Sequence, residues 1–396
     1  MCGSIDNTGV WGDFNMNNKV KDILVNTVFR VGSGLNRFFA KKDNVVLLYS
    51  NVGFRDNVRS IYDYMIRNGY NAKYHIIISA TRFLPDNLPD NVEVVSNVRG
   101  ILKYYTAKHV FYCQGKIPLY PAQNQYVVQM WHGTPFKGND KRQGKATTNK
   151  PYYSHIFSSS PYFEQIIMDN FYVNRENVAI CGQPRTDVLF EENLLPDELS
   201  HFDKLILWLP TWRKSAIVGQ EDVKQTSVVP IFKMEDLNEL EKRLSERNIG
   251  LLIKLHYMQD LDLLKDTHFA HILLLSDIDF QNRGWDLYRI MSQTSALVTD
   301  YSSVFYDYML LDRPIAYAID DFDEYMSRRG FVVDDPEYFM AGEKIKKKDD
   351  FYRFIGHVAE GKDPYKAQRN EVNRITHTYI DGNNCKRALE IGGVCL

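Results

Sequence analysis

Residues 126–137 read YVVQMWHGTPFK, an apolar run that leads directly into a histidine, a glycine and a proline. The run predicts a buried parallel strand that ends just before His132. Gly133 allows a sharp turn, and Thr134 and Pro135 suit the cap and the first position of a following helix. The imidazole would then lie where open α/β sheets bind ligands and helix starts attract phosphate. For a histidine taken alone, packing in a tight turn is the ordinary alternative.

Short apolar runs recur on both sides of this stretch, separated by amphipathic segments of helical length. The predicted strands are 45–49, 74–78, 92–95, 110–113, 126–128, 156–157, 177–181, 205–209, 251–256, 272–275, 296–300 and 314–318. Such alternation is typical of parallel sheets covered by helices on both faces. We therefore predict an α/β fold with two successive doubly wound, Rossmann-like domains whose strand ends face each other across a cleft.

Three regions follow from this pattern. Residues 1–44 form an N-terminal basic amphipathic segment, 45–195 a first Rossmann-like domain and 196–396 a second one, with an acidic linker around residues 191–203. Within the first region, residues 18–42 combine basic and apolar side chains at helical spacing. Such a segment can lie on an anionic membrane surface, or it can pack on the domain with a solvated basic face. The pattern alone does not separate these alternatives.

Composition excludes several classes of partner. A net charge of −2 gives no global attraction to nucleic acid, and we predict no nucleic-acid partner. The five cysteines include no C-x-x-C pair, which favours a reducing cytosol and no zinc site. The sequence shows no signal peptide and no apolar stretch long enough to span a bilayer.

Polar and charged residues follow the predicted strands at five places. They are His132, Arg185, Thr211 with Arg213, Lys254 with His256, and Asp300 with Ser302 and Ser303. Packing alone explains this recurrence poorly, because charged groups are rarely buried without a partner. Arginine and lysine are phosphate ligands, and the two serines precede a predicted helix whose amides could bind phosphate. For the serines alone, an ordinary helix cap is the alternative.

Three motifs in this set carry a resemblance. WHGTP at 131–135, PTWR at 210–213 and TDYSS at 299–303, followed by Asp307, resemble the CDP-glycerol glycerophosphotransferase family. Its members prime and polymerise teichoic acids, and related enzymes act in capsule synthesis. The resemblance extends from about residue 45 to about residue 374. It implies a GT-B-like fold and transfer of a polyol phosphate from a CDP-polyol to a hydroxyl, with release of CMP.

The resemblance also implies a set of site residues. The donor site would be formed by Gly133, Thr134, Pro135, Phe136, Arg185, Thr211, Trp212, Arg213, Lys254, Asp300, Ser302, Ser303 and Asp307, with His132 and His256 as the catalytic candidates. His132 would take the proton from the attacking hydroxyl. His256 would contact phosphate or exchange roles with His132. We predict no metal and no cofactor, because no acidic cluster resembles a two-metal site.

The implied partners are a CDP-polyol donor and a lipid-linked or polymeric hydroxyl acceptor. The first domain would hold the acceptor and the second the donor, at the inner face of a bacterial cell membrane. A basic stretch, Lys137, Lys141, Arg142, Lys145 and Lys150, would receive an anionic acceptor or would simply be a solvated loop. The chain is closer in size to primases than to large polymerases, and that choice stays open. The rival functions are a sugar-nucleotide glycosyltransferase and a non-catalytic nucleotide-binding membrane assembly protein.

Overall fold

The structure, a computed structural model, describes residues 27, 29–114, 117, 119–138, 152–210, 227–255 and 269–396. The chain divides into two compact units. The first comprises Met1–His132, Lys145–Asp187 and Asn383–Leu396, and the second Gly133–Gly144 and Val188–Gly382, so far as their residues are described. The division predicted at residue 195 differs from these units, because residues 133–138 belong with the second unit and the last 14 residues with the first.

The first unit is built on a seven-stranded sheet in which every pairing is parallel. The strands are β1 Lys42–Tyr49, β2 His75–Ser79, β3 Val92–Val95, β4 Ala107–Tyr112, β5 Tyr126–Gln129, β6 His155–Ser158 and β7 Val178–Ile180, in the spatial order β3-β2-β1-β4-β5-β6-β7. Apolar side chains on the two faces of this sheet form two separate core clusters. From β1 the chain runs outward through β2 to β3, then returns to β4 and runs outward on the other side to β7, as in a doubly wound sheet.

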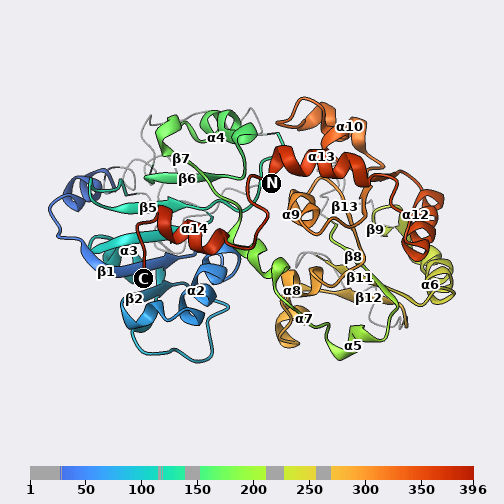
Figure 1. The fold of residues 1–396 in the computed structure, drawn as a ribbon, viewed down its shortest axis with the longest axis horizontal. Helices are drawn as coiled ribbons and strands as arrows, with labels where there is room; N and C mark the ends of the chain where they lie inside the picture. The colour runs from blue at the N-terminus through green and yellow to red at the C-terminus, as the bar shows by residue number, and fades with distance from the viewer. Residues whose placement is uncertain are drawn as a thin grey trace, which may run out of the picture. The chain divides into compact units, whose positions relative to one another are not determined.

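Helices cover both faces of this sheet. They are α2 Asn57–Arg67, α3 Asn97–Tyr104, α4 Glu164–Phe171 and α14 Asn384–Ile391. Although α14 lies near the C-terminus, it packs with the first unit, as its red ribbon among the blue and green elements shows (Figure 1). Ala388 and Leu389 share a core with Val58 of α2. The Asp187 carboxylate accepts hydrogen bonds from the backbone N–H groups of the first two residues of α14, which fixes the start of this helix.

The second unit repeats the architecture with a six-stranded parallel sheet. Its strands are β8 Lys204–Trp208, β11 Ile249–Lys254, β12 Ile272–Leu275, β13 Ala296–Thr299, β14 Ile315–Ala318 and β15 Glu343–Ile345, in the order β12-β11-β8-β13-β14-β15. A separate antiparallel pair is formed by β9 Ser227–Val229 and β10 Phe232–Lys233. The helices are α5 Asp197–Ser200, α6 Leu237–Ser245, α7 Asp277–Asn282, α8 Leu287–Met291, α9 Val304–Met309, α10 Phe322–Arg328, α11 Pro336–Phe339, α12 Lys348–Glu360 and α13 Lys366–Thr376.

The predicted fold class is confirmed: each unit is a doubly wound α/β domain with a parallel sheet. All 12 predicted strands are present, within a few residues of their predicted bounds. The predicted cleft between the two units stays a prediction. Among the described residues no helix has the length and apolarity needed to cross a bilayer.

Candidate functional site

The first part of the candidate site is the turn that follows β5 in the first unit. Trp131 has φ +57° and Gly133 has φ +146°. Glycine adopts such backbone at little cost, whereas a bulky L-residue in the left-handed region is strained by roughly 1–2 kcal/mol. The Trp131 indole lies against the His132 imidazole, with ring centroids 4.1 Å apart, and against Phe171 at 4.6 Å. His132 is therefore half-buried at the carboxyl end of a parallel strand, as the sequence predicted.

Arg185, predicted as a donor ligand, lies beneath this turn. Its side chain is 9% exposed and forms an ion pair of 2.6 Å with Asp56. The same Nη1 also donates a hydrogen bond to the backbone carbonyl of His132 at 3.1 Å. This placement favours a role for Arg185 in holding the turn.

The segment after His132 differs from its prediction. Thr134 and Pro135 do not start a helix, and residues 133–138 run in an irregular, extended path. The backbone groups expected to turn into a helix pair instead with the segment around Phe331. Gly138 donates to the carbonyl of Gly330, and the carbonyl of Phe136 accepts from the N–H of Val332. No helix start within 133–138 can therefore supply phosphate-binding amides beside His132.

The side chains of this segment are anchored in the second unit. Thr134 is 3% exposed and Phe136 is 1% exposed. The Phe136 ring lies 4.9 Å from that of Phe305 on α9 and 4.7 Å from that of Phe331. Gly133 and Pro135 complete the segment. Phe136 thus acts as a hydrophobic anchor that holds the segment against α9.

The second part of the site is the carboxyl end of β13. Asp300 is fully buried, and its carboxylate accepts a hydrogen bond from the backbone N–H of Ser302 at 3.1 Å. The Ser302 hydroxyl accepts from the N–H of Val304 at 3.5 Å, and Ser303 makes no side-chain cap bond. Both serines are partly exposed. Both serines follow β13 at its carboxyl end, and their binding of an anionic ligand stays a prediction.

Asp307, one turn into α9, is more deeply buried than a residue that contacts the donor needs to be. It is 1% exposed and accepts a hydrogen bond of 2.6 Å from the Tyr288 hydroxyl. The imidazole of His377, on the loop after α13, is buried and interacts electrostatically with this carboxylate. That burial lowers the pKa of His377 from 6.5 to about 4. This environment favours a structural role for Asp307, which anchors α9 through its hydrogen bond with Tyr288.

Lys254, at the end of β11, has a partner that the sequence analysis missed. Its ammonium pairs with the carboxylate of Asp277 at the start of α7, and both side chains are mostly buried. The same Nζ lies 5.5 Å from the centre of the Phe280 ring. Asp277 itself follows β12 by two positions, so the strand-end rule that selected Lys254 could also have found it.

Four predicted site residues lie outside the described residues: Thr211, Trp212, Arg213 and His256. The same holds for Lys141, Arg142, Lys145 and Lys150 of the basic stretch, while Lys137 is described and half-buried. Among the described residues, no group of three or more His, Cys, Asp or Glu side chains is arranged to hold a metal ion.

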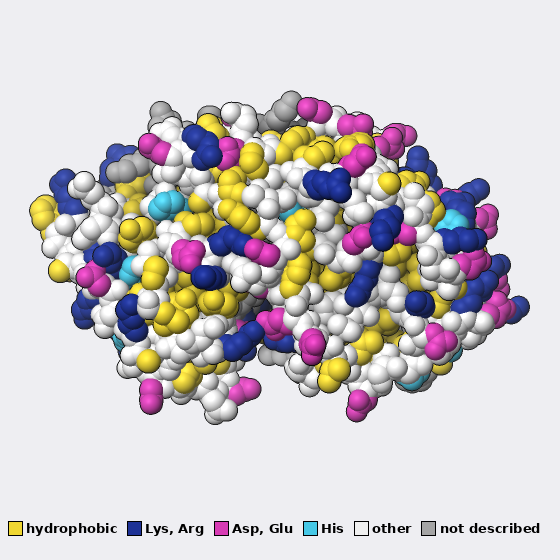
Figure 2. Space-filling view, viewed as in Figure 1, with side chains coloured by type: hydrophobic (Ala, Val, Ile, Leu, Met, Phe, Trp, Pro, Cys, Tyr) yellow, Lys and Arg dark blue, Asp and Glu magenta, His cyan; other side chains and the backbone are white. Residues whose placement is uncertain are grey.

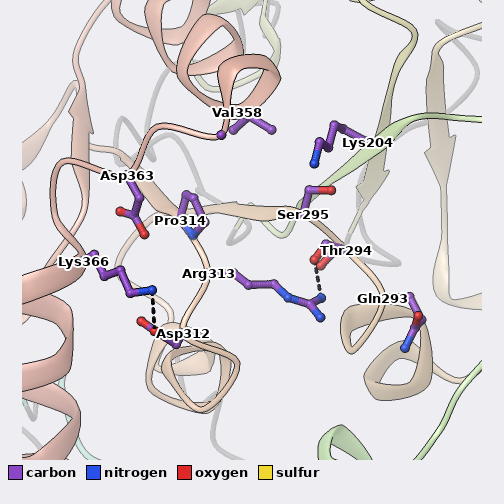
Figure 3. Close-up of a pocket in the computed structure, with 11 residues that line it drawn as sticks. Lys204, Gln293, Thr294, Ser295, Asp312, Arg313, Pro314, Val358, Asp363 and Lys366 are labelled. Carbon is purple, nitrogen blue, oxygen red and sulfur yellow. Dashed lines mark hydrogen bonds and ion pairs between the residues drawn. The ribbon is translucent and has the colours of Figure 1, made fainter.

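A cavity of about 450 Å³ lies elsewhere in the second unit (Figure 3). It is lined by Lys204 at the start of β8, Ser295 just before β13 and Pro314 just before β14, and hence lies at the amino ends of the strands. Its cations are largely engaged: Arg313 donates to the carbonyls of residues 292 and 294, and Lys366 pairs with Asp312. The cavity therefore lies at the opposite edge of the sheet from the predicted donor ligands.

Comparisons with known proteins identify the family of the chain. The family described as CDP-Glycerol:Poly(glycerophosphate) glycerophosphotransferase matches residues 33–391. The chain belongs to this family. It is 29% identical over 334 residues to a teichoic acid poly(glycerol phosphate) polymerase of Staphylococcus epidermidis, which covers 74% of this chain and 43% of the relative. It is also 29% identical over 316 residues to a polymerase of the same name from Bacillus spizizenii, which covers 72% and 76%.

Solved structures support the fold of this family member. The wall teichoic acid polymerase TagF, in a form soaked with CDPG, has a TM-score of 0.70 and 22% identity, covering 94% of this chain and 95% of that one. A UDP-N-acetylglucosamine 2-epimerase has a TM-score of 0.51 and 12% identity, covering 88% and 95%. At these identities the likeness shows the fold alone, and it confirms the GT-B-like class.

Proposed function

We propose that this family member transfers a polyol phosphate, most directly glycerol phosphate, from a CDP-polyol to a hydroxyl of a lipid-linked or polymeric acceptor and releases CMP. The family match over residues 33–391 carries this proposal. The chain spans less than half of one polymerase that it resembles and about three quarters of another, so the activity of the whole relative is inferred and needs a direct test.

The held turn at His132 supports the catalytic half of the proposal. In the reaction, the acceptor oxygen forms a bond to the phosphorus that carries the polyol, and the bond from that phosphorus to the CMP oxygen breaks. A neutral imidazole at His132 takes the proton of the attacking hydroxyl, because histidine ordinarily titrates near neutral pH. The Trp131 ring packed on one side of the imidazole restricts its rotation.

The strand ends of the second unit support the donor half. Phosphoryl transfer depends mainly on positioning and on stabilising negative charge. Lys254, Ser302 and Ser303 come from the carboxyl ends of two parallel strands of one sheet, where open sheets bind ligands. With Thr211, Trp212, Arg213 and His256, they would bind the diphosphate and stabilise the departing CMP.

The proposal also places the protein at the inner face of the cell membrane, attached to its anionic surface. In the helical stretch 29–36 and its continuation, Val31, Leu35 and Phe38 recur at helical spacing and are 60%, 50% and 75% exposed. The opposite side packs on the domain, since Asn36 is fully buried and its Nδ2 donates to the carbonyl of Tyr120 and to the side-chain oxygen of Gln125. Both predicted alternatives therefore have support: one side packs on the domain and the other presents apolar side chains flanked by basic ones. On the face shown in Figure 2, basic and acidic side chains are interspersed.

A CMP-release assay tests the proposal directly. CDP-glycerol, CDP-ribitol and UDP-sugars are each supplied with a synthetic lipid-diphosphate disaccharide as acceptor. Released CMP is quantified, and the masses of the products are measured by mass spectrometry. CMP release with addition of one or more polyol phosphates supports the proposal, and the number of units separates priming from polymerisation. Sugar transfer instead identifies a glycosyltransferase. Binding of CDP-glycerol with no CMP release from any acceptor identifies a non-catalytic binding protein.

A further inference from the structure

Two side chains from distant parts of the first unit hold the turn that carries His132. The Nδ2 group of Asn57, the first residue of α2, donates to the carbonyl of Trp131 at 2.9 Å. The guanidinium of Arg185 donates to the carbonyl of His132 at 3.1 Å. Consecutive carbonyls, one before and one after the Cα of His132, are thus each held by a side chain. The two peptide groups that set the direction of the imidazole are both restrained.

The Asn57 side chain is fully satisfied and fully buried. Besides Trp131, its Nδ2 donates to the Gln183 side-chain oxygen at 2.7 Å, and its Oδ1 accepts from the backbone N–H of Arg185 at 3.1 Å. The reverse orientation of the amide would place its oxygen against two acceptors and its nitrogen against a donor. The network therefore requires a neutral amide at position 57, with its donors toward Trp131 and Gln183.

Asp56 joins the two restraints at the cost of backbone strain. Its φ of 64° and ψ of −150° lie in a region that is essentially restricted to glycine. Its carboxylate accepts from the N–H of Asn57 at 2.8 Å and from Arg185 at 2.6 Å. Such strain persists only where surrounding contacts determine it, and it gathers at functional sites. Here strained residues lie at both ends of the network, at Asp56 and at Trp131.

We infer that Asp56, Asn57 and Arg185 form a clamp whose role is to position the His132 imidazole for proton transfer. Without the clamp, the left-handed backbone at Trp131 would relax and the direction of the His132 side chain would change. Small displacements of a reacting group are costly, with about 100-fold lost for roughly 1 Å. The three residues act through His132, so they are positioning residues. The inference rests on the proposed function, in which His132 is the general base.

Asn57→Asp tests the clamp with a minimal change of shape. The variant keeps an oxygen toward the N–H of Arg185 and replaces the donor toward Trp131 with an acceptor. Turnover should fall by about 10- to 100-fold, the KM for CDP-glycerol should stay within about threefold, and the acid limb of the pH–rate profile should shift. Asn68→Asp is the matched control, because Asn68 caps the other end of α2 and is exposed. It should change none of these quantities. Arg185→Lys is the second variant if Asn57→Asp does not fold.

The same change in a His132→Ala background separates positioning from general structural damage. If Asn57 acts through His132, Asn57→Asp should cost little further turnover there, since no imidazole remains to be positioned. An equal loss in both backgrounds would overturn the inference.

A readout independent of turnover is NMR of the histidine rings in the full chain. Asn57→Asp, or Arg185→Lys, should shift the His132 ring signals and their titration and leave the exposed His201 unchanged. Unaltered His132 signals and titration in a folded variant would contradict the inference that these residues position His132. If the wild-type chain releases no CMP from any CDP-polyol, the proposed function fails, while this measurement still decides the clamp.

Discussion

The two candidate strand ends, after β5 in the first unit and after β13 in the second, differ in how their backbone groups are held. The turn at His132 is held by side chains 74 and 53 positions away along the chain. In the turn after Thr299, the backbone N–H groups are held by near neighbours: that of Ser302 donates to the Asp300 carboxylate and that of Val304 to the Ser302 hydroxyl. The longer-range contacts there come from side chains, because the Thr299 hydroxyl donates to the carbonyl of Leu209 and the Tyr301 hydroxyl to Asp321. The first turn contains a strained tryptophan, whereas residues 299–303 include no residue with positive φ.

This difference suggests that the two turns have different roles, one in proton transfer and the other in binding the diphosphate. A group that transfers a proton must be held within a fraction of an ångström, which justifies distant, buried restraints and their strain. Hydroxyls that bind a diphosphate tolerate small adjustments, so local hydrogen bonds suffice.

The largest effect is expected at the strained turn. His132→Ala should lower turnover by about 10²–10⁴-fold, because it removes the proposed base. The affinity for CDP-glycerol should change far less, because proton abstraction matters mainly in the transition state. CMP release at saturating donor and calorimetric titration of CDP-glycerol measure the two quantities.

His256→Ala is the comparison for that variant. A phosphate ligand should chiefly raise the KM of the donor. Near-normal turnover in His132→Ala together with lost turnover in His256→Ala would reverse the two roles. Normal turnover in both would show that neither histidine is the base.

The next effect concerns the stability of the clamp. Arg185→Ala leaves the Asp56 carboxylate largely buried without its cation, and should lower the free energy of unfolding by about 3–5 kcal/mol. Arg59→Ala is the matched control on α2, because the Arg59–Asp63 pair has side chains 41% exposed. It should cost less than about 1 kcal/mol. Denaturant unfolding of both variants measures the difference. Unchanged stability with weakened CDP-glycerol binding in Arg185→Ala would restore the donor contact that the sequence predicted.

The contrast between the two turns also explains what the sequence could predict. Both sheets were predictable because most strands are continuous apolar runs in a parallel arrangement. The strand β15, Glu343–Ile345, was missed because it has three residues and only one of them is apolar. The helix predicted at Thr134 and Pro135 was wrong, because capping preferences are local and the chain there pairs with a segment nearly 200 positions away.

The candidate site residues also differ in whether a local sequence pattern marks them. Strand-end position selected His132, Lys254, Ser302 and Ser303, since that rule needs only the sequence. Asn57 left no such signal: a buried amide with partners 74 and 126 positions away has no local pattern. Likewise, the sequence showed Arg185 as a cation after a strand, and only the fold shows that Asp56 pairs with it.

Acid should lower the free energy of unfolding through His377, which is buried and interacts electrostatically with Asp307 of α9. Burial lowers the pKa of His377 from 6.5 to about 4, so the unfolded chain binds this proton more readily than the folded chain does. Its contribution to stability is full above pH 6.5 and is lost as the pH falls toward 4, by up to about 3 kcal/mol. Urea unfolding between pH 7 and pH 4 should therefore show a steeper loss in the wild type than in His377→Gln. An equal loss of stability with pH in both proteins would show that His377 does not contribute to it.

The smallest effects concern how the donor is held at the end of β11 in the second unit. Lys254→Ala should weaken CDP-glycerol binding by about 1.5–3 kcal/mol, the range for a hydrogen bond to a charged group. Asp277→Asn should act in the opposite direction or not at all, because Asp277 competes with the donor's diphosphate for the same ammonium. Calorimetry on both variants tests the pair. If Asp277→Asn weakens donor binding as much as Lys254→Ala, the carboxylate orients the lysine, and this end of the site is also held by a restraint distant in sequence.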